Sequence, residues 1–339
     1  MNRKIVVSIV MPIYNESKYI DQCLQSLLKQ DYEFDLMEWI FVDGNSIDDT
    51  VIRLEKYREQ YPDLIIIMNN PHKIVPCAMN IGIAASKGKY IVRLDAHADY
   101  SKDYISKCVY YLDTVDADNV GGVIETKSSG FTGNCIAKIL SSRFGVGNSE
   151  FRTKGKRGYV DTVPFGAFRR EVFSKYGGYD ERLVRNQDNE MNYRIRKNGG
   201  KIYLSDDIHL SYYCRDSIKG IADMARKNGM WSIITMKLCH GAMGARHFIP
   251  FFFVISIIGL GCLGFFFKPF WWILSVELCL YLMLDIRFSL KIMSSIKELF
   301  LIFILFPIFH ISYGYGSLVG IVKLFSKEYR DTSYIVPTI

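Results

Sequence analysis

Three side chains that can bind a metal ion crowd the stretch RLDAHADY, residues 93–100. Asp95, His97 and Asp99 alternate along it, and alternate residues of an extended chain face the same side. Carboxylates suit Mg²⁺ or Mn²⁺, and an imidazole shifts the preference toward Mn²⁺ or a later metal. Such an ion would bridge two phosphates of a substrate and neutralise a leaving diphosphate. The alternative is a polar strand end in which His97 makes only a packing contact.

Two further acids stand at or near the expected starts of helices. Asp43, in FVDGNSIDDT, suits either turn and cap chemistry or a hydrogen bond from a nucleobase. Asp188 comes at or near the start of a helix that ends at Asn198 and Gly199. An acid in that position is a cap or a partner of the helix dipole, or else a general base.

The elements that must position these residues alternate between strands and helices. Apolar, β-branched runs predict the strands, and capping residues and prolines predict the helices between them. The strands are expected at 5–11, 38–44, 64–68 and 90–95, and the helices are expected to start near Ser17, Ser46, Pro76 and Ser101. Such units form parallel βαβ crossovers in a doubly wound α/β sheet, whose ligand lies at the carboxyl ends of the strands. Residues 12–16, Asp43 and Asp95 are therefore expected to converge on one site.

Composition and missing motifs narrow the class of protein. The chain has 339 residues, 49% of them hydrophobic, and a formal net charge of +7. This modest charge argues against a nucleic-acid partner and suits a face that lies on anionic lipid. Neither GxGxxG after a strand nor GxxxxGK[ST] occurs, which argues against dinucleotide and P-loop sites. The eight cysteines lack CxxC spacing and are expected to be reduced. The apolar run before Pro12 is too short for a signal peptide, so we expect the N-terminal part in the cytosol.

The surroundings of the chain are expected to change from water to membrane after residue 245. We assign 1–245 to a cytosolic domain, 246–325 to a membrane domain and 326–339 to a cytosolic tail. Stretches at about 248–267 and 270–286 are long enough to cross a bilayer, and about 287–298 reads as an interfacial amphipathic helix. Residues 299–322 form one kinked span or a re-entrant hairpin, and the bases that follow favour the hairpin. Glu277, in the second span, is either functional or paired inside the protein.

Several of these segments together resemble a known family. VSIVMPIYNES, IFVDGNSIDDT, NPHKIVPCAMNIGIAASKGKYIVRLDAHADY, VDTVPFGAFRREVF, GGYDERLVRNQDNEMNYRIRKNGG and ARKNGMWS occur in this order. The string resembles the family-2 glycosyltransferases with the GT-A fold, and more narrowly their membrane-attached, succinoglycan-biosynthesis-type subgroup, over roughly residues 5–245. The resemblance implies a Rossmann-like, mostly parallel sheet followed by C-terminal membrane helices. It also implies inverting sugar transfer from a nucleotide diphosphate sugar.

The resemblance also implies roles for single residues. Pro12, Asn15 and Glu16 would edge the nucleotide pocket, Asp43 would bind the base, and Lys73 replaces a frequent arginine beside it. Asp95 takes the first position of the metal-binding D-x-D motif, for Mn²⁺ or Mg²⁺. His97 stands where the last aspartate is usual, with Asp99 as a possible substitute. Asp188 takes the position of the catalytic base, after Gln187 where glutamate is common.

The residues that would bind the acceptor form no single motif in the sequence. The segment 142–163 is rich in glycine, serine and bases, so it is either a solvated loop or a clamp on the diphosphate of a polyprenyl-linked acceptor. Arg226 and Trp231, in RKNGMWS, are similar to a family element near the diphosphate and acceptor. The full set of acceptor or diphosphate candidates is Arg143, Arg152, Arg157, Glu190, Arg226 and Trp231.

These observations predict an inverting glycosyltransferase on the cytosolic face of a bacterial-type inner membrane. It would move a sugar, with a UDP-sugar favoured, to a polyprenyl-diphosphate-linked saccharide during capsule or exopolysaccharide assembly. One alternative is a polyprenyl-phosphate sugar synthase, whose acceptor is itself a phosphate and needs little base catalysis. The other is a non-enzymatic membrane scaffold or transport component. The donor sugar, the linkage and the oligomeric state are left open.

Overall fold

The computed structural model describes residues 3–153 and 155–326, and it divides into two compact units. Unit one comprises residues 3–125 and 155–212, and unit two comprises residues 126–153 and 213–326. Lys154 and all of the predicted cytosolic tail except Ser326 lie outside the described residues.

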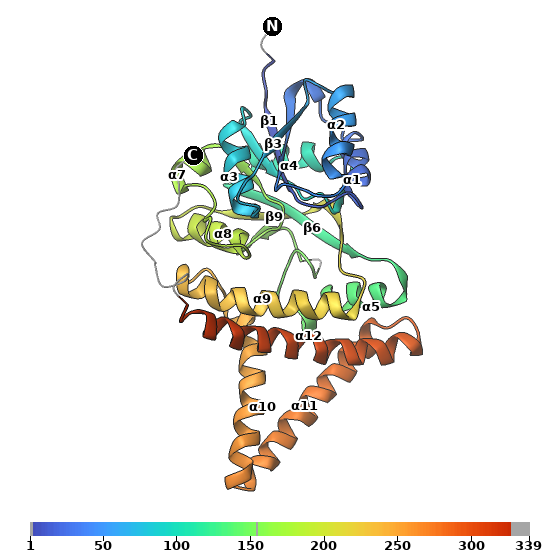
Figure 1. Ribbon diagram of the computed structural model, residues 1–339, viewed down its shortest axis with the longest axis vertical. Coiled ribbons are helices and arrows are strands. Elements are labelled where there is room, and N and C mark those ends of the chain that lie inside the picture. The colour runs from blue at the N-terminus through green and yellow to red at the C-terminus, as the bar shows by residue number, and fades with distance from the viewer. Residues whose placement is uncertain (1–2, 154, 327–339) are drawn as a thin grey trace. The chain divides into compact units, whose positions relative to one another are not determined.

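The first half of unit one is the predicted parallel sheet. Its strands run in the order β3-β2-β1-β4, and all three pairings are parallel. The strands are β1 (Val7–Ile13), β2 (Met37–Asp43), β3 (Ile65–Asn69) and β4 (Tyr90–Arg93), and the helices between them are α1 (Ile20–Leu27), α2 (Thr50–Gln60) and α3 (Val75–Ala85). Every residue of β2 is buried, as expected for a strand covered on both faces. The predicted crossovers are confirmed (Figure 1).

The second half of the sheet was not predicted from the sequence. Beyond β4 the order continues β8-β6-β9-β5, and the pairings of β8 with β4 and β6, of β5 with β9 and of β7 with β9 are antiparallel. The elements are β5 (Ala98–Tyr100), α4 (Tyr104–Thr114), β6 (Asn119–Lys127), β7 (Gly158–Tyr159), β8 (Ala167–Arg169), α7 (Glu171–Tyr176), α8 (Gln187–Lys197) and β9 (Ile202–Tyr213). Most of these strands are too short to show alternation of apolar residues. The sheet is therefore mixed, and its parallel half carries the predicted strand ends.

Unit two contains the apolar C-terminal helices. Its elements are α5 (Gly130–Leu140), α6 (Arg143–Val146), α9 (Ile218–Leu238), α10 (Ile249–Phe266), α11 (Pro269–Ile292) and α12 (Ile296–Lys323). In Figure 1, α9 and α12 lie side by side, and α10 and α11 form a hairpin that leaves this pair. Among the described residues, two helical segments are long and apolar enough to cross a membrane, Ala245–Phe266 and Ile296–Lys323, and α11 is not one of them.

Two expectations about the C-terminal segment are wrong. No separate helix covers 287–298, because α11 continues without a break to Ile292 and a new helix starts at Ile296. Of the two alternatives for residues 299–322, the favoured hairpin is wrong, because α12 runs through Pro307 as one helix. The division into units also differs from the predicted boundary at 245, since α9 packs with α12 and belongs to unit two.

Candidate functional site

The loops that follow β1 and β2 are tied together by hydrogen bonds. Asn15 has a left-handed backbone with φ of 54°, which asparagine tolerates. Its Oδ1 accepts a hydrogen bond from the Ile47 amide at 2.9 Å. The Glu16 amide donates to Thr50 Oγ1 at 2.7 Å, and Pro12 lies inside β1. The residues predicted at these strand ends therefore share one edge of the sheet.

Asp43, the last residue of β2, caps its own turn. Its carboxylate accepts hydrogen bonds from the Ser46 amide at 3.1 Å and from the Ser46 hydroxyl at 2.6 Å. Its backbone oxygen accepts from the Asn70 amide at 2.7 Å, at the start of the turn that contains Lys73. Lys73 is exposed and has a left-handed backbone, with φ of 60°. The turn and cap role of Asp43 is present in the structure, and its contact with a nucleobase stays a prediction.

Arg93, the last residue of β4, joins the two acids that were assigned the main catalytic roles. Its Nη1 donates a hydrogen bond to Asp188 Oδ1, and its Nη2 lies 3.4 Å from Asp95 Oδ1. The Arg93 side chain is only 5% exposed, whereas that of Asp188 is 35% exposed. The guanidinium also lies 5.9 Å from the ring centroid of Phe165. We assigned Arg93 no role from the sequence, although a cation at the end of a buried strand requires a partner, and this was the available signal.

The stretch RLDAHADY is not one extended segment, so the predicted alternation of its side chains is wrong. The chain turns at Ala96 and His97 between β4 and β5. His97 Nδ1 lies 3.3 Å from Glu16 Oε1, and His97 Nε2 lies 3.3 Å from the hydroxyl of Tyr212, a contact that sequence reasoning missed. Asp99 accepts a hydrogen bond from Gln22 Nε2 at 2.5 Å. The turn thus directs the three predicted metal ligands to different partners.

A protein-only metal cluster is absent from the described residues. Across 3–153 and 155–326, no group of three or more His, Cys, Asp or Glu side chains is arranged to hold an ion. The set of Asp95, His97 and Asp99 is therefore not assembled. A catalytic Mg²⁺ commonly takes one or two carboxylates and completes its shell with substrate phosphates and water. Asp95, which is 18% exposed, fits such an ion as a single protein ligand.

The Cys23 thiol is buried near three carboxylates of this region. Burial raises the pKa of the Cys23 thiol well above its usual value, and Asp99, Asp95 and Glu16 raise it further. Its Sγ lies 3.8 Å from the backbone oxygen of Asp95. A thiol with a raised pKa stays protonated at neutral pH and is a poor nucleophile or metal ligand. Cys23 is therefore a packing residue beside the acidic strand ends.

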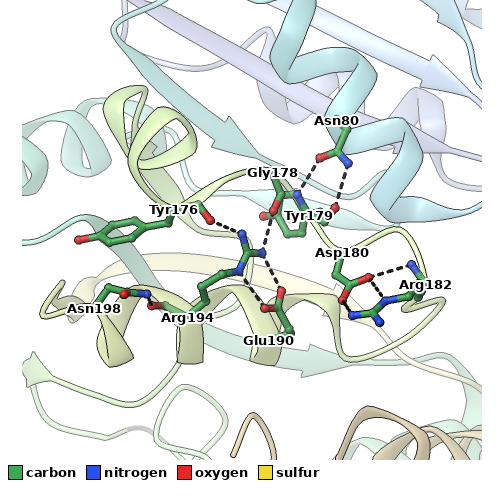
Figure 2. A network of polar contacts seen from close by, with 9 residues as sticks. All are labelled: Asn80, Tyr176, Gly178, Tyr179, Asp180, Arg182, Glu190, Arg194 and Asn198. Atoms are coloured by element: carbon green, nitrogen blue, oxygen red, sulfur yellow. Dashed lines mark hydrogen bonds and ion pairs between the residues drawn. The ribbon is translucent and has the colours of Figure 1, made fainter. Parts of the chain in front are cut away.

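Asp188 is the second residue of α8, which confirms its predicted place at a helix start. The helix follows Asn186, whose backbone is left-handed with φ of 64°. The preceding loop is anchored to α3, because Asn80 accepts a hydrogen bond from the Tyr179 amide at 2.7 Å and donates to the Tyr179 carbonyl at 2.9 Å (Figure 2). Burial raises the pKa of Tyr179 to about 12, so its hydroxyl stays neutral.

The Glu190 carboxylate is paired with Arg194, which holds this loop. It accepts hydrogen bonds from Arg194 Nε and Nη2 at 2.8 and 2.7 Å. Arg194 in turn donates to the carbonyls of Tyr176 and Gly178 (Figure 2). Glu190 is 5% exposed, so its predicted acceptor or diphosphate role is not supported by its position. The network instead sets the position of α8, and hence of Asp188.

The basic candidates fall into both units. Arg157, in unit one, pairs with Asp206 and Asp207 of β9. Arg143, Arg152, Arg226 and Trp231 lie in unit two. Arg143 is exposed on α6, Arg152 lies 3.3 Å from Thr126 Oγ1, Arg226 pairs with Asp223 at 2.8 Å, and Trp231 is buried in α9. Their acceptor roles stay predictions.

Comparison with known proteins places this geometry in context. The family model described as "Glycosyl transferase family 2" matches residues 8–177. A Methanococcus voltae protein, "Dolichyl N-acetyl-alpha-D-glucosaminyl phosphate 3-beta-D-2,3-diacetamido-2,3-dideoxy-beta-D-glucuronosyltransferase", is 27% identical over 330 residues, which cover 94% of this chain and 97% of that protein. "Succinoglycan biosynthesis protein ExoA" of Rhizobium meliloti is 28% identical over 209 residues, covering 61% of this chain and 63% of that protein.

Solved structures agree on the fold. The mannosyltransferase PcManGT from Pyrobaculum calidifontis, in complex with GDP-Man and Mn²⁺, aligns with a TM-score of 0.59 at 16% identity, covering 93% of this chain and 86% of that one. Staphylococcus aureus TarS in complex with UDP aligns with a TM-score of 0.53 at 18% identity, covering 93% and 90%. At such identities the likeness concerns the fold alone.

Proposed function

Because the chain belongs to glycosyl transferase family 2, we propose that it transfers a sugar from a nucleotide diphosphate sugar to a lipid-linked saccharide, with inversion at the anomeric carbon. The family and the GT-A fold expected from the sequence are confirmed. The single observation that carries the proposed site is the Arg93 guanidinium, which contacts both Asp95 and Asp188. The donor side and the acceptor side of the reaction would therefore meet at one buried cation.

The proposed chemistry assigns a different role to each acid. An acceptor hydroxyl attacks the anomeric carbon from the face opposite the leaving diphosphate, and the bond from that carbon to the phosphate oxygen breaks. Asp188 accepts the hydroxyl proton as general base. Asp95 would hold Mn²⁺ or Mg²⁺, which when bound neutralises charge on the leaving diphosphate. Arg93 orients both carboxylates, and Glu16 and Tyr212 fix the His97 ring beside them.

The proposed substrates follow from the sequence resemblance and the relatives. The Methanococcus voltae relative is named for a dolichyl-linked acceptor, which supports a polyprenyl-linked saccharide here. The solved neighbours hold GDP-Man or UDP, which supports a nucleotide donor without choosing its base, and we keep UDP-sugars as the first to assay. We place the reaction at the cytosolic face of a bacterial-type plasma membrane, because bases flank the apolar hairpin. The relative named for succinoglycan biosynthesis supports a role in capsule or exopolysaccharide assembly.

Replacing the base tests this proposal. Asp188→Asn should lower the rate of sugar transfer by about 10²–10⁴-fold, since a positioned general base contributes that much. Donor binding, followed as the thermal shift produced by UDP with Mn²⁺, should stay near the wild-type value. Asp206→Asn, which removes an acid of β9 that pairs with Arg157, is the matched control and should keep its activity.

The same variant separates the alternatives. A polyprenyl-phosphate sugar synthase would lose little activity in Asp188→Asn, because its acceptor is already an anion. Activity close to wild type with a saccharide acceptor would refute the base assignment. A scaffold or transport component would show no transfer with any nucleotide sugar, in the wild type as in the variant.

A further inference from the structure

Helix α12 has two apolar faces, and only one of them is covered. Its buried residues include Ile302, Leu305, Phe306, Phe309 and Tyr313. Its exposed large apolar side chains are spaced by four or seven residues, which puts them on one side of a helix. These residues, which we call the α12 stripe, are Ile296, Phe300, Ile304, Ile311, Tyr315 and Val322. No Asp, Glu, Lys or Arg occurs between residues 299 and 322, so the stripe is continuous.

The covered face of α12 lies against a helix that carries charge. A Cβ placed on Gly229 of α9 would lie 1.9 Å from the Tyr313 backbone oxygen, and one on Gly316 would lie 1.9 Å from the Arg226 backbone oxygen. The two backbones therefore touch. Along this contact α9 carries Asp223, Arg226 and Lys227, whose side chains are 39–44% exposed. Such charges are costly in hydrocarbon, so α9 and the helix paired with it belong at the level of the head groups.

The other end of α12 is held at a polar surface as well. Lys138 of α5 forms an ion pair with Glu298 at 2.5 Å and donates a hydrogen bond to Ser294 at 2.7 Å. Charged partners thus occupy both the first turn of α12 and its last third. If α12 crossed the bilayer, these two contacts would lie on opposite sides of the membrane, and the charged helix α9, which packs along α12, would have to cross with it.

The α10–α11 hairpin, unlike the charged surroundings of α12, exposes mostly apolar side chains. Among its described side chains most large apolar ones are exposed, and Phe265 and Phe266 near its tip are 82% and 81% exposed. Helices of 18 and 24 residues are about 27 and 36 Å long, enough for a hydrocarbon core of about 30 Å. Glu277 of α11 accepts a hydrogen bond from Ser256 of α10, which confirms the interpretation that Glu277 is paired within the protein. Lys268, Trp271 and Trp272 at the tip are typical interfacial residues.

We propose that α10 and α11 alone cross the bilayer, as a hairpin, and that α12 lies in the plane of the membrane surface with its stripe toward the acyl chains. The occupant of the stripe is lipid, because the stripe continues the exposed apolar surface of the hairpin and has bases only at its ends, Lys297 and Lys323. Arg287 and Lys291 then lie on the same side of the membrane as α9, in agreement with the positive-inside tendency. This proposal concerns membrane insertion and does not depend on the catalytic assignment.

Labelling of single cysteines tests the topology. In a full-length background with Cys239, Cys262 and Cys279 replaced by serine, the reporters are His240→Cys, Lys268→Cys and Ser326→Cys. An impermeant maleimide should label Lys268→Cys from one side of the membrane, and both His240→Cys and Ser326→Cys from the other. Labelling of Ser326→Cys from the side of Lys268→Cys would show that α12 crosses and would overturn the proposal. Protection of Lys268→Cys from both sides would overturn the crossing hairpin.

Immersion depth tests the stripe itself. Nitroxide labels at Ile296→Cys, Ile304→Cys, Ile311→Cys and Val322→Cys, in vesicles of phosphatidylethanolamine and phosphatidylglycerol, should show similar and shallow immersion by oxygen and nickel-chelate collision. A profile that deepens toward Ile311 and rises again would indicate a span. Shielding from both collision reagents, with spin–spin broadening that disappears on dilution with unlabelled protein, would show that a second copy covers the stripe. Either result would overturn the assignment of lipid as its occupant.

Discussion

At the scale of single residues, the unusual feature is a buried cation shared by two acids. Arg93 is 5% exposed, and its Nε has no hydrogen-bond partner among the described residues. Removing such a group from water costs free energy that the two carboxylates must offset. An apolar residue at the end of β4 would avoid that cost. The arginine is therefore best explained as a positioning residue that fixes Asp95 and Asp188 in one arrangement.

Arg93→Gln should lower kcat by about 10²-fold, because the loss of a hydrogen bond to a charged group costs about 1.5–3 kcal/mol. The kcat of Arg93→Lys should lie between those of the wild type and Arg93→Gln, since lysine keeps the charge without the planar fork. The measurement is steady-state kinetics with separate kcat and KM. The KM for the donor should change little, which distinguishes a positioning role from a general loss of folded protein.

The matched control is Arg170→Gln, which removes a second arginine near the sheet. Arg170 donates to the Gly88 carbonyl at 2.7 Å and to Ser86 Oγ at 2.9 Å. Its replacement should lower the melting temperature while the folded enzyme keeps its kcat. Wild-type kcat in Arg93→Gln would show that the contact with Asp188 has no catalytic role.

Much of the candidate site could be predicted at this scale, and the remainder depends on the folded loop. The strand-end acids Asp43 and Asp95 follow from apolar runs that stop abruptly, and Asp188 follows from helix-start chemistry. His97 and Asp99 could not be placed, because the turn at Ala96 and His97 has no strong glycine or proline signal. The pairing of Glu190 with Arg194 follows the i, i+4 spacing of a helix. The carbonyls of Tyr176 and Gly178 that hold Arg194 are not revealed by any local pattern.

At the scale of elements, glycines set the distance between α9 and α12. Glycine in a helix interior is intrinsically unfavourable by about 1 kcal/mol relative to alanine, so its use needs a packing reason. Gly229, Gly316 and Gly320 each face a backbone oxygen of the other helix. Close backbone contact of this kind is typical of helix pairs in or beside membranes.

Gly316→Ala should destabilise the protein, because the new Cβ would lie 1.9 Å from the Arg226 backbone oxygen and the helices must separate. Overpacking of this kind costs about 1–3 kcal/mol. The control is Gly259→Ala in α10, where nothing lies within 4 Å of the added carbon and helix propensity should make the change neutral or slightly stabilising. The measurement is the melting temperature in detergent, from intrinsic fluorescence. Equal melting temperatures for the two variants would contradict the close contact.

The elements of the parallel half were predictable because apolar runs and caps recur at regular intervals. Of the C-terminal helices, α10 and α11 match the stretches predicted at about 248–267 and 270–286. The surroundings of α12 could not be predicted, because hydropathy reports the preference of a segment for apolar surroundings and not the identity of those surroundings. Residues 299–322 read as membrane-embedded from the sequence, yet one face of α12 packs on α9. The bases at 287–291 similarly suggested a new helix, although α11 simply extends beyond its apolar part.

At the scale of the whole molecule, the soluble and apolar parts of the sequence do not match the compact units. Unit two combines α5 and α6, which lie between β6 and β7 in the chain, with α9 and the C-terminal helices. Phe144 of α6 stacks on Phe288 of α11 at 5.1 Å and packs edge-on against Phe306 of α12 at 4.9 Å. The apolar C-terminal segment is therefore a structural partner of residues 126–153 as well as a candidate membrane anchor.

A chain that ends at residue 245 should consequently fail to form a stable unit two. Its α9 would lose the cover of α12 at Gly229 and at Ile233, which is 3% exposed in the full chain. Exposed apolar faces of this size favour aggregation, so we expect low yield and no cooperative melting, even in detergent. The comparison is a chain in which a flexible linker replaces only residues 256–280, most of the hairpin, and α12 is kept. That chain should melt cooperatively and be stabilised by UDP with Mn²⁺, which would attribute the requirement to α12 packing rather than to membrane insertion. Cooperative melting of the 245-residue chain, with the same stabilisation by UDP as the full chain, would refute the proposed dependence.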